Sequence, residues 1–196
     1  PKYSLTLDRE MTTYTGLVTL VQLSAGILGD RNRMSYDAGI SYIRNVFEAT
    51  RTLQKNPDDL DARGIIMMGA SLSTSSRLGI GKEEPFAYEI YELEFLPEKL
   101  FGSSYRRSLT SVFPRFLQAM GKHHADDIRK FYHDAFGFDS SIEESSRKLV
   151  ELFEGLGVEM YYDGKITREQ VDAIPCHTEL SLSLIHISEP TRQAEI

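Results

Sequence analysis

Apolar positions recur every three to four residues along most of the chain, which is the spacing of one face of an α-helix. The clearest case is residues 35–55, where the apolar positions include Ile40, Ile43, Val46, Phe47 and Leu53. Little of the sequence alternates with a period of two, the pattern of a half-buried strand. We therefore expect a mainly α protein, a bundle of seven or eight helices.

Capping residues and prolines predict where these helices begin and end. Asp8 can cap a first helix that runs to about Gly29, and PKYSLTL before it is predicted as a short strand or an extended lead-in. Asn56-Pro57 ends the next helix, because a residue before proline avoids the helical region. Further helices are expected from Pro57 to about Ser73 and over residues 86–96, 105–120, 125–136, 141–156 and 167–173, with a break at PEKLFGSS.

The helix that Pro57 opens is apolar nearly all round, which predicts a central position in the bundle. Its small residues would let neighbouring helices approach closely, and its adjacent methionines, Met67 and Met68, are expected to fill the core. The predicted core contains Ile43, Phe47, Ile65, Met68, Leu72 and Leu109.

Composition narrows the class of protein. The chain has 196 residues, of which 41% are hydrophobic and 26% charged, as in a soluble globular domain. A formal net charge of -7 argues against a nucleic-acid binder, and no run of 18 apolar residues predicts a membrane span. The single cysteine, Cys176, cannot form an internal disulfide, so we expect a cytoplasmic protein.

The last residues depart from the helical pattern. LSLIHISEPTR, residues 182–192, resembles the translation of a transposase-type sequencing adapter, and QAEI fits the index and primer bases that follow it. We expect a helical domain over residues 1–181, truncated at both ends, and an adapter-derived artefact over 182–196. The chain from about Cys176 onward is expected to be frayed.

Three segments, taken in order, resemble one family. PKYSLTLDREMTTYTGLVTLVQ, NPDDLDARGIIMMGASL and FGSSYRRSLTSVFPRFL are similar to the helical domain of iron-containing alcohol dehydrogenases, a fold of the dehydroquinate synthase type. In that family the first segment continues Thr-Gly-x-Asp-x-x-x-His, and the third contains Gly-x-x-His. The resemblance extends over residues 1–174.

The resemblance implies one half of a two-domain oxidoreductase. In the family, an N-terminal α/β domain binds NAD(P), and the helical domain holds a divalent metal ion that polarises the oxygen of a small alcohol or aldehyde. Here the Gly-rich phosphate-binding turn would lie upstream, because GIG at residues 79–81 is predicted as a loop between helices. A homo-oligomer is compatible with the sequence.

The family's four metal ligands, carried over by position, fall on Val18, Gln22, Glu89 and Tyr105. The spacing from Glu89 to Tyr105 is two residues longer than in the family. Val has no lone pair, Gln is a weak donor and neutral Tyr is a poor ligand, which leaves one strong donor. We therefore expect a degenerate metal site, with Val18 filling the core and Gln22 forming hydrogen bonds.

Two other groups of residues could carry chemistry. In KHHADDIRKFYHDAF, His123 and Asp127 are spaced to chelate a metal on one helical face, although surface residues of this kind are usually solvated. In EEPFAYEIYELE, Tyr88, Glu89 and Glu92 could supply a general acid or base, with a solvated amphipathic helix as the favoured interpretation.

Three functions follow from these observations. The first is a fragment of an NAD(P)-dependent oxidoreductase, and the second is a non-catalytic helical scaffold that binds a partner and has lost the metal. The third, a stand-alone helical binding module, is weaker because the chain starts inside a family motif.

Overall fold

The computed structural model describes residues 1–75, 78–81, 89–164, 167, 169 and 170, and none of these residues lies in a β-strand. The predicted mainly α bundle is therefore confirmed. The elements are a 3-10 helix η1 (Lys2–Thr6) and the α-helices α1 (Arg9–Ile27), α2 (Arg33–Lys55), α3 (Leu60–Ser73), α4 (Ile90–Leu93), α5 (Phe95–Phe101), α6 (Tyr105–Met120), α7 (Ala125–Phe136) and α8 (Ile142–Glu154). The expected adapter-derived segment, residues 182–196, and the chain from Cys176 lie outside the described residues.

Side-chain caps begin several helices, and the predicted cap Asp8 is one of them. Asp8 accepts a hydrogen bond from the Met11 amide at 2.7 Å, and Asp59 accepts one from the Ala62 amide at 2.9 Å. Each cap satisfies a backbone N–H that has no partner within its helix. Aspartate side chains thus fix the starts of α1 and α3.

Two local predictions were wrong. The lead-in before α1 is neither a strand nor extended, because the Ser4 and Leu7 amides turn back to bond the carbonyls of Pro1 and Ser4. The expected break at residues 97–104 begins only at Gly102, which has a φ of 64°. Pro97 lies in the first turn of α5, where a missing N–H leaves no helical hydrogen bond unmade.

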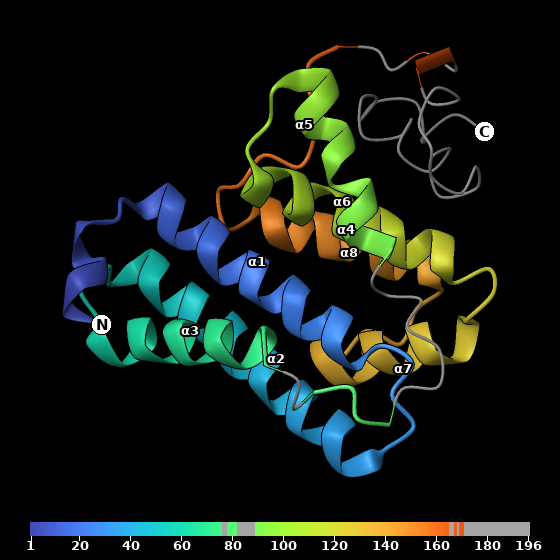
Figure 1. Cartoon of the computed structure of the whole chain (residues 1–196), viewed down its shortest axis with the longest axis horizontal. Coiled ribbons are helices and arrows are strands. Elements are labelled where there is room, and N and C mark those ends of the chain that lie inside the picture. Colours follow the sequence, from blue (N-terminus) through green and yellow to red (C-terminus); the bar gives the residue numbers. More distant parts are fainter. Residues whose placement is uncertain (76–77, 82–88, 165–166, 168, 171–196) are drawn as a thin grey trace.

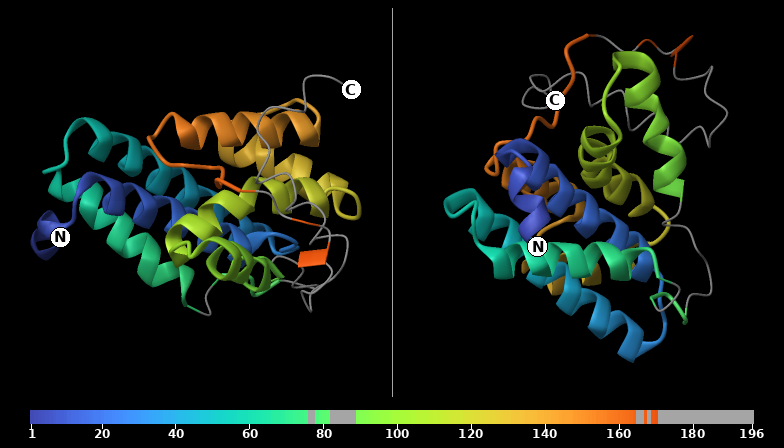
Figure 2. Two further views of the ribbon diagram at one scale, coloured as in Figure 1. Left: turned by 90° about the horizontal axis from the view of Figure 1, so that it is seen from above. Right: turned by 60° about the vertical axis from the view of Figure 1, so that its left-hand side comes forward.

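Helix α1 lies at the centre of the bundle. It packs against α2 and α3 on one side and against α6 on the other, and α8 covers α6 (Figure 1). The views in Figure 2 show the same order of layers from two further directions. Of the helices in the described residues, none contains the long apolar stretch needed to cross a bilayer.

Residues Thr12, Thr13, Thr19 and Ser24 are polar, yet they are buried in α1. Each hydroxyl donates to the carbonyl four residues earlier at 2.7–2.8 Å, so none needs a partner outside the helix. Gly16 lets α1 pack closely against α2. A Cβ atom at this position would clash with the Thr50 side chain of α2. The backbones of α1 and α2 can therefore approach closely.

The predicted central position of α3 was wrong. Met67 and Met68 are 51% and 62% exposed, and Ile65 is 38% exposed. The helix lies at the side of the bundle and buries only the face that carries Ala62, Arg63, Ile66 and Gly69. A helix that is apolar all round gives no sequence signal for which face turns inward. Of the other predicted core residues, Ile43, Phe47 and Leu109 are buried and Leu72 is half-buried.

We predict that Leu109→Ala lowers the free energy of unfolding by about 2–5 kcal/mol, because it removes a fully buried side chain. Met68→Asp should change it by less than about 1 kcal/mol, because that position faces solvent. Urea unfolding followed by circular dichroism measures both values. A larger loss for Met68→Asp than for Leu109→Ala would contradict this arrangement of α3.

Candidate functional site

Side chains from three helices meet around Gln22. Its amide nitrogen donates a hydrogen bond to the Tyr105 hydroxyl oxygen at 3.1 Å, and its amide oxygen accepts one from the Ser73 hydroxyl at 3.0 Å. Gln22 belongs to α1, Ser73 ends α3 and Tyr105 begins α6. Both ends of the half-buried amide are therefore used in holding three helices together.

Tyr105 is placed by the turn before α6. Gly102 adopts a left-handed conformation after α5, and Ser104 caps α6 by accepting a hydrogen bond from the Arg107 amide at 3.4 Å. Tyr105 is 37% exposed. The hydroxyl oxygen accepts from Gln22, which leaves the hydroxyl proton to be donated.

Glu94 is a buried carboxylate at the junction of α4 and α5. The residue is 3% exposed, and its Oε2 atom has no hydrogen-bond partner. Burial, with a contribution from the charge of Glu98, raises the pKa of Glu94 to about 7. At neutral pH this side chain therefore exists in both the neutral and the charged form.

Tyr105 and Glu94 are electrostatically connected. Burial raises the pKa of Tyr105 and the negative charges of Glu94 and Glu98 raise it further, although the hydrogen bond with Gln22 acts in the opposite direction. Glu94 joins α4 to α5, and both of these helices pack against α6, which begins at Tyr105. Neutral Tyr105 is a proton donor at physiological pH.

Glu94 is not among the predicted site residues, although the sequence contains a signal for it. Ile90, Leu93 and Pro97 are buried on one helical face, and Glu94 falls on that face one turn after Ile90. A carboxylate on an apolar face is an informative exception to the hydrophobic pattern. Glu92, which the sequence suggested as an acid or base, is exposed.

The four positions that the family resemblance assigned to metal ligands are distributed as follows. Val18 is 7% exposed and packs within the hydrophobic core, one turn before Gln22 in α1. Gln22 and Tyr105 are joined by the hydrogen bond described above. Glu89 is half-buried and directly precedes α4.

The alternative chelating pair at His123 and Asp127 does not have the predicted helical geometry. α7 begins at Ala125, so His123 precedes the helix, and Asp127 forms an ion pair with Arg31 at 2.6 Å. Within the part of the chain that the structure describes, no three His, Cys, Asp or Glu side chains are grouped to hold a metal ion.

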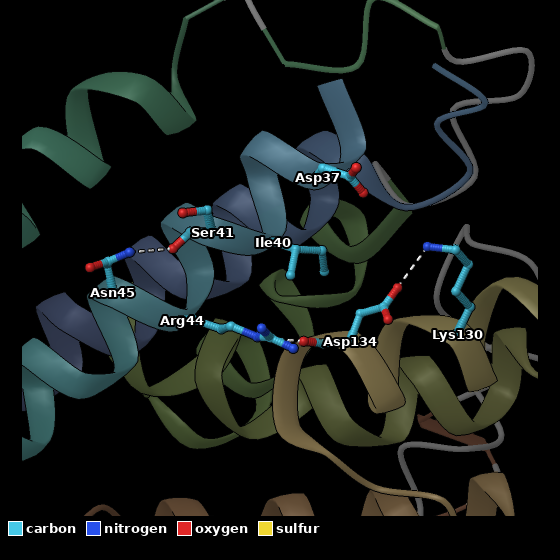
Figure 3. A pocket seen from close by; sticks show the side chains of 7 residues that line it. All are labelled: Asp37, Ile40, Ser41, Arg44, Asn45, Lys130 and Asp134. Atoms are coloured by element: carbon cyan, nitrogen blue, oxygen red, sulfur yellow. Dashed lines mark hydrogen bonds and ion pairs between the residues drawn. The ribbon is translucent and has the colours of Figure 1, made fainter. Parts of the chain in front are cut away.

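A polar pocket lies between α2 and α7 (Figure 3). Its lining residues already bind one another, because Asp134 accepts from Lys130 at 2.6 Å and the Arg44 Nε donates to the Asp134 carbonyl at 2.6 Å. Tyr36 donates to the same Asp134 carboxylate at 3.1 Å. These bonds join α2 to α7.

Three solved structures share this arrangement of helices. The NADH-dependent butanol dehydrogenase A of Thermotoga maritima matches with a TM-score of 0.72 at 19% identity, over 94% of this chain and 47% of its own. An iron-containing alcohol dehydrogenase from Corynebacterium glutamicum matches with a TM-score of 0.70 at 18% identity, over 96% and 55%. The aldehyde reductase YqhD from E. coli matches with a TM-score of 0.68 at 14% identity, over 81% and 43%.

The chain has the fold of the helical part of iron-containing alcohol dehydrogenases. It spans about half the length of these three dehydrogenase and reductase structures. No protein-family model matches the sequence, and no curated protein matches it. At identities of 14–19%, the similarity to the alcohol dehydrogenase structures establishes the fold.

The raised pKa of Glu94 predicts a pH dependence of stability. The unfolded chain ionises near the ordinary value of 4.5, whereas the folded chain retains the proton up to about 7. The free energy of unfolding should therefore fall as pH rises from 4.5 to 7, because the folded state binds more protons in this window.

Glu94→Gln should remove most of this fall, and Glu92→Gln, which changes an exposed carboxylate in α4, should retain it. Thermal melting at several pH values between 4 and 8 measures the effect. Parallel pH profiles for the wild type and Glu94→Gln would contradict the prediction.

Proposed function

We propose that this chain is the helical half of an NAD(P)-dependent alcohol or aldehyde oxidoreductase in which the family's metal position no longer binds metal. The fold supports the family-level part of the proposal, because the three similar structures are a butanol dehydrogenase, an alcohol dehydrogenase and an aldehyde reductase. The hydrogen bonds from Gln22 to Tyr105 and from Ser73 to Gln22 support the loss of metal.

The residues at the ligand positions do not fit a divalent cation. Val18 offers no donor atom, and the Gln22 oxygen accepts from Ser73. Burial raises the pKa of Tyr105, which keeps its hydroxyl neutral and makes it a poor ligand. Glu89 is the one anionic group at these positions, and a catalytic metal normally takes three protein ligands.

A nicotinamide cofactor would be bound by the remainder of the protein. The similar structures are about twice as long as the region that this chain matches, and one of them is described as NADH-dependent. The helical half would then contribute the groups that hold the substrate oxygen and move its proton. A small alcohol or aldehyde is the substrate class that this proposal assigns.

A second function, a partner-binding scaffold, is favoured by one observation. α3 presents an exposed apolar face formed by Leu60, Ile65, Met67 and Met68. Exposed apolar surface of this kind is a feature of interaction sites. The upstream coding sequence separates the two functions, because a strand, a Gly-rich turn and a helix encoded there would favour the oxidoreductase.

We predict that the native chain binds zinc no more tightly than scattered surface groups allow. The double variant Val18→Asp with Gln22→His should gain zinc affinity at least about tenfold, because it places two strong ligands one helical turn apart. Isothermal titration calorimetry measures the affinity, and Gln22→His alone is the matched control.

Because Val18 is buried, the double variant should also melt at a lower temperature without zinc and recover stability with it. Submicromolar one-to-one binding of zinc by the native chain, abolished by Glu89→Ala and unaffected by His123→Ala, would overturn the loss of metal.

The 196-residue chain by itself is expected to oxidise no alcohol and reduce no aldehyde when NAD(P) or NAD(P)H is added, because hydride transfer needs a bound nicotinamide. Absorbance at the nicotinamide band follows the reaction. Turnover by the purified chain that is lost on heating would contradict this expectation.

A further inference from the structure

The solvent-facing side of α3 lacks the charged residues that other surface helices of the bundle carry. Residues 64–75 include no charged residue, whereas exposed positions of α8 carry Glu143, Arg147 and Glu151. Arg63, the cation that precedes this stretch, is buried. A helix face that lies in water usually carries charged side chains. The absence of charge on this side of α3 therefore indicates a face that is covered in the complete protein.

Large apolar side chains occupy this face instead. Met67 and Met68 are 51% and 62% exposed, and with Leu60 and Ile65 they form what we call the outer face of α3. The N-terminal segment adds further exposed apolar side chains. Eight of the twelve exposed large apolar side chains in the described residues belong to these two regions, namely Leu60, Ile65, Met67 and Met68 on α3 and Tyr3, Leu5, Leu7 and Met11 in the N-terminal segment. Apolar surface concentrated in this way is typical of a contact with another folded unit.

The N-terminus of the chain lies beside the outer face of α3 (Figure 1). The Arg63 guanidinium donates to the Pro57 carbonyl at 2.8 Å and also to the Ser4 carbonyl, which ties η1 to α3. A Cβ atom at Gly64 would lie 3.5 Å from the Cγ atom of Pro1. A polypeptide joined to Pro1 would therefore start next to the outer face of α3.

The similar structures indicate what such a polypeptide is. The chain matches 47% of the Thermotoga maritima dehydrogenase and 55% of the Corynebacterium glutamicum dehydrogenase, and these proteins have an N-terminal domain that is missing from this chain. A second copy of the chain is a less favourable occupant of the outer face. Each copy has a formal net charge of -7, and like charges oppose association.

We propose that the outer face of α3, together with η1, is the docking surface for the N-terminal domain of the complete protein. This inference rests on the proposed function, which supplies that domain. The contact would be mainly apolar, and a domain held close by a short connection loses little freedom on docking. Because Ser73 at the end of the same helix bonds Gln22, docking on α3 would also fix the nicotinamide domain relative to the candidate site.

Oxidation of methionine by hydrogen peroxide tests this contact, because exposed thioethers react faster than buried ones. The complete protein, expressed from the source gene, is compared with the 196-residue chain by mass spectrometry. Met67 and Met68 should oxidise about tenfold more slowly in the complete protein. Met34, which is 80% exposed in the first turn of α2, is the internal control and should oxidise at the same rate in both.

Met68→Asp is the matched variant. In the chain it should leave the oxidation rate of Met67 unchanged, because both side chains already face solvent. In the complete protein the charge would be buried in the contact and should raise the oxidation rate of Met67 about fivefold. Met34→Asp should change neither rate. The comparison of the two wild-type proteins does not depend on whether the Met68→Asp protein folds.

Equal oxidation of Met67 and Met68 in the complete protein and in the chain would overturn the proposal. Protection that increases with protein concentration would also overturn it and would identify a second copy as the occupant, because docking within one polypeptide is independent of concentration. Failure of the proposed function is distinguishable. A complete protein that protects both methionines but transfers no hydride to or from a nicotinamide would contradict the oxidoreductase and retain the docking surface.

Discussion

Helix α1 is enclosed by α2, α3 and α6, and the packing of these helices follows from what α1 buries. Of its 19 residues, 14 are buried, so nearly every polar group on the helix needs a partner inside the protein. The buried threonines and Ser24 satisfy this requirement within α1 by bonding their own backbone. Close packing against α2 is made possible by Gly16, where a side chain would collide with Thr50.

Gln22 meets the same requirement with partners outside α1. Its side chain instead reaches Ser73 of α3 and Tyr105 of α6. The central helix therefore fixes the position of the Tyr105 hydroxyl. The junction of α1, α3 and α6 is thus a consequence of how α1 meets its hydrogen-bonding requirement.

The burial of Glu94 lowers the stability of the fold and raises the pKa of its carboxyl group. A leucine or glutamine in this position would remove the cost of an ionisable group on the face that also carries Ile90 and Leu93. The same burial brings the pKa of Glu94 to about 7, where a carboxyl group both gives and accepts protons at neutral pH.

The helical class and the start of α1 could be predicted from the sequence, because a cap such as Asp8 acts within a few residues of the backbone that it satisfies. The sequence also indicated the family resemblance and the burial of Ile43 and Leu109. The sequence did not show which of the two apolar helices, α1 or α3, is central. Neither has its apolar residues confined to one face, so only the tertiary packing places α1 inside the bundle. The tertiary packing also decided which polar side chains meet, since the bond between Gln22 and Tyr105 joins residues 83 positions apart.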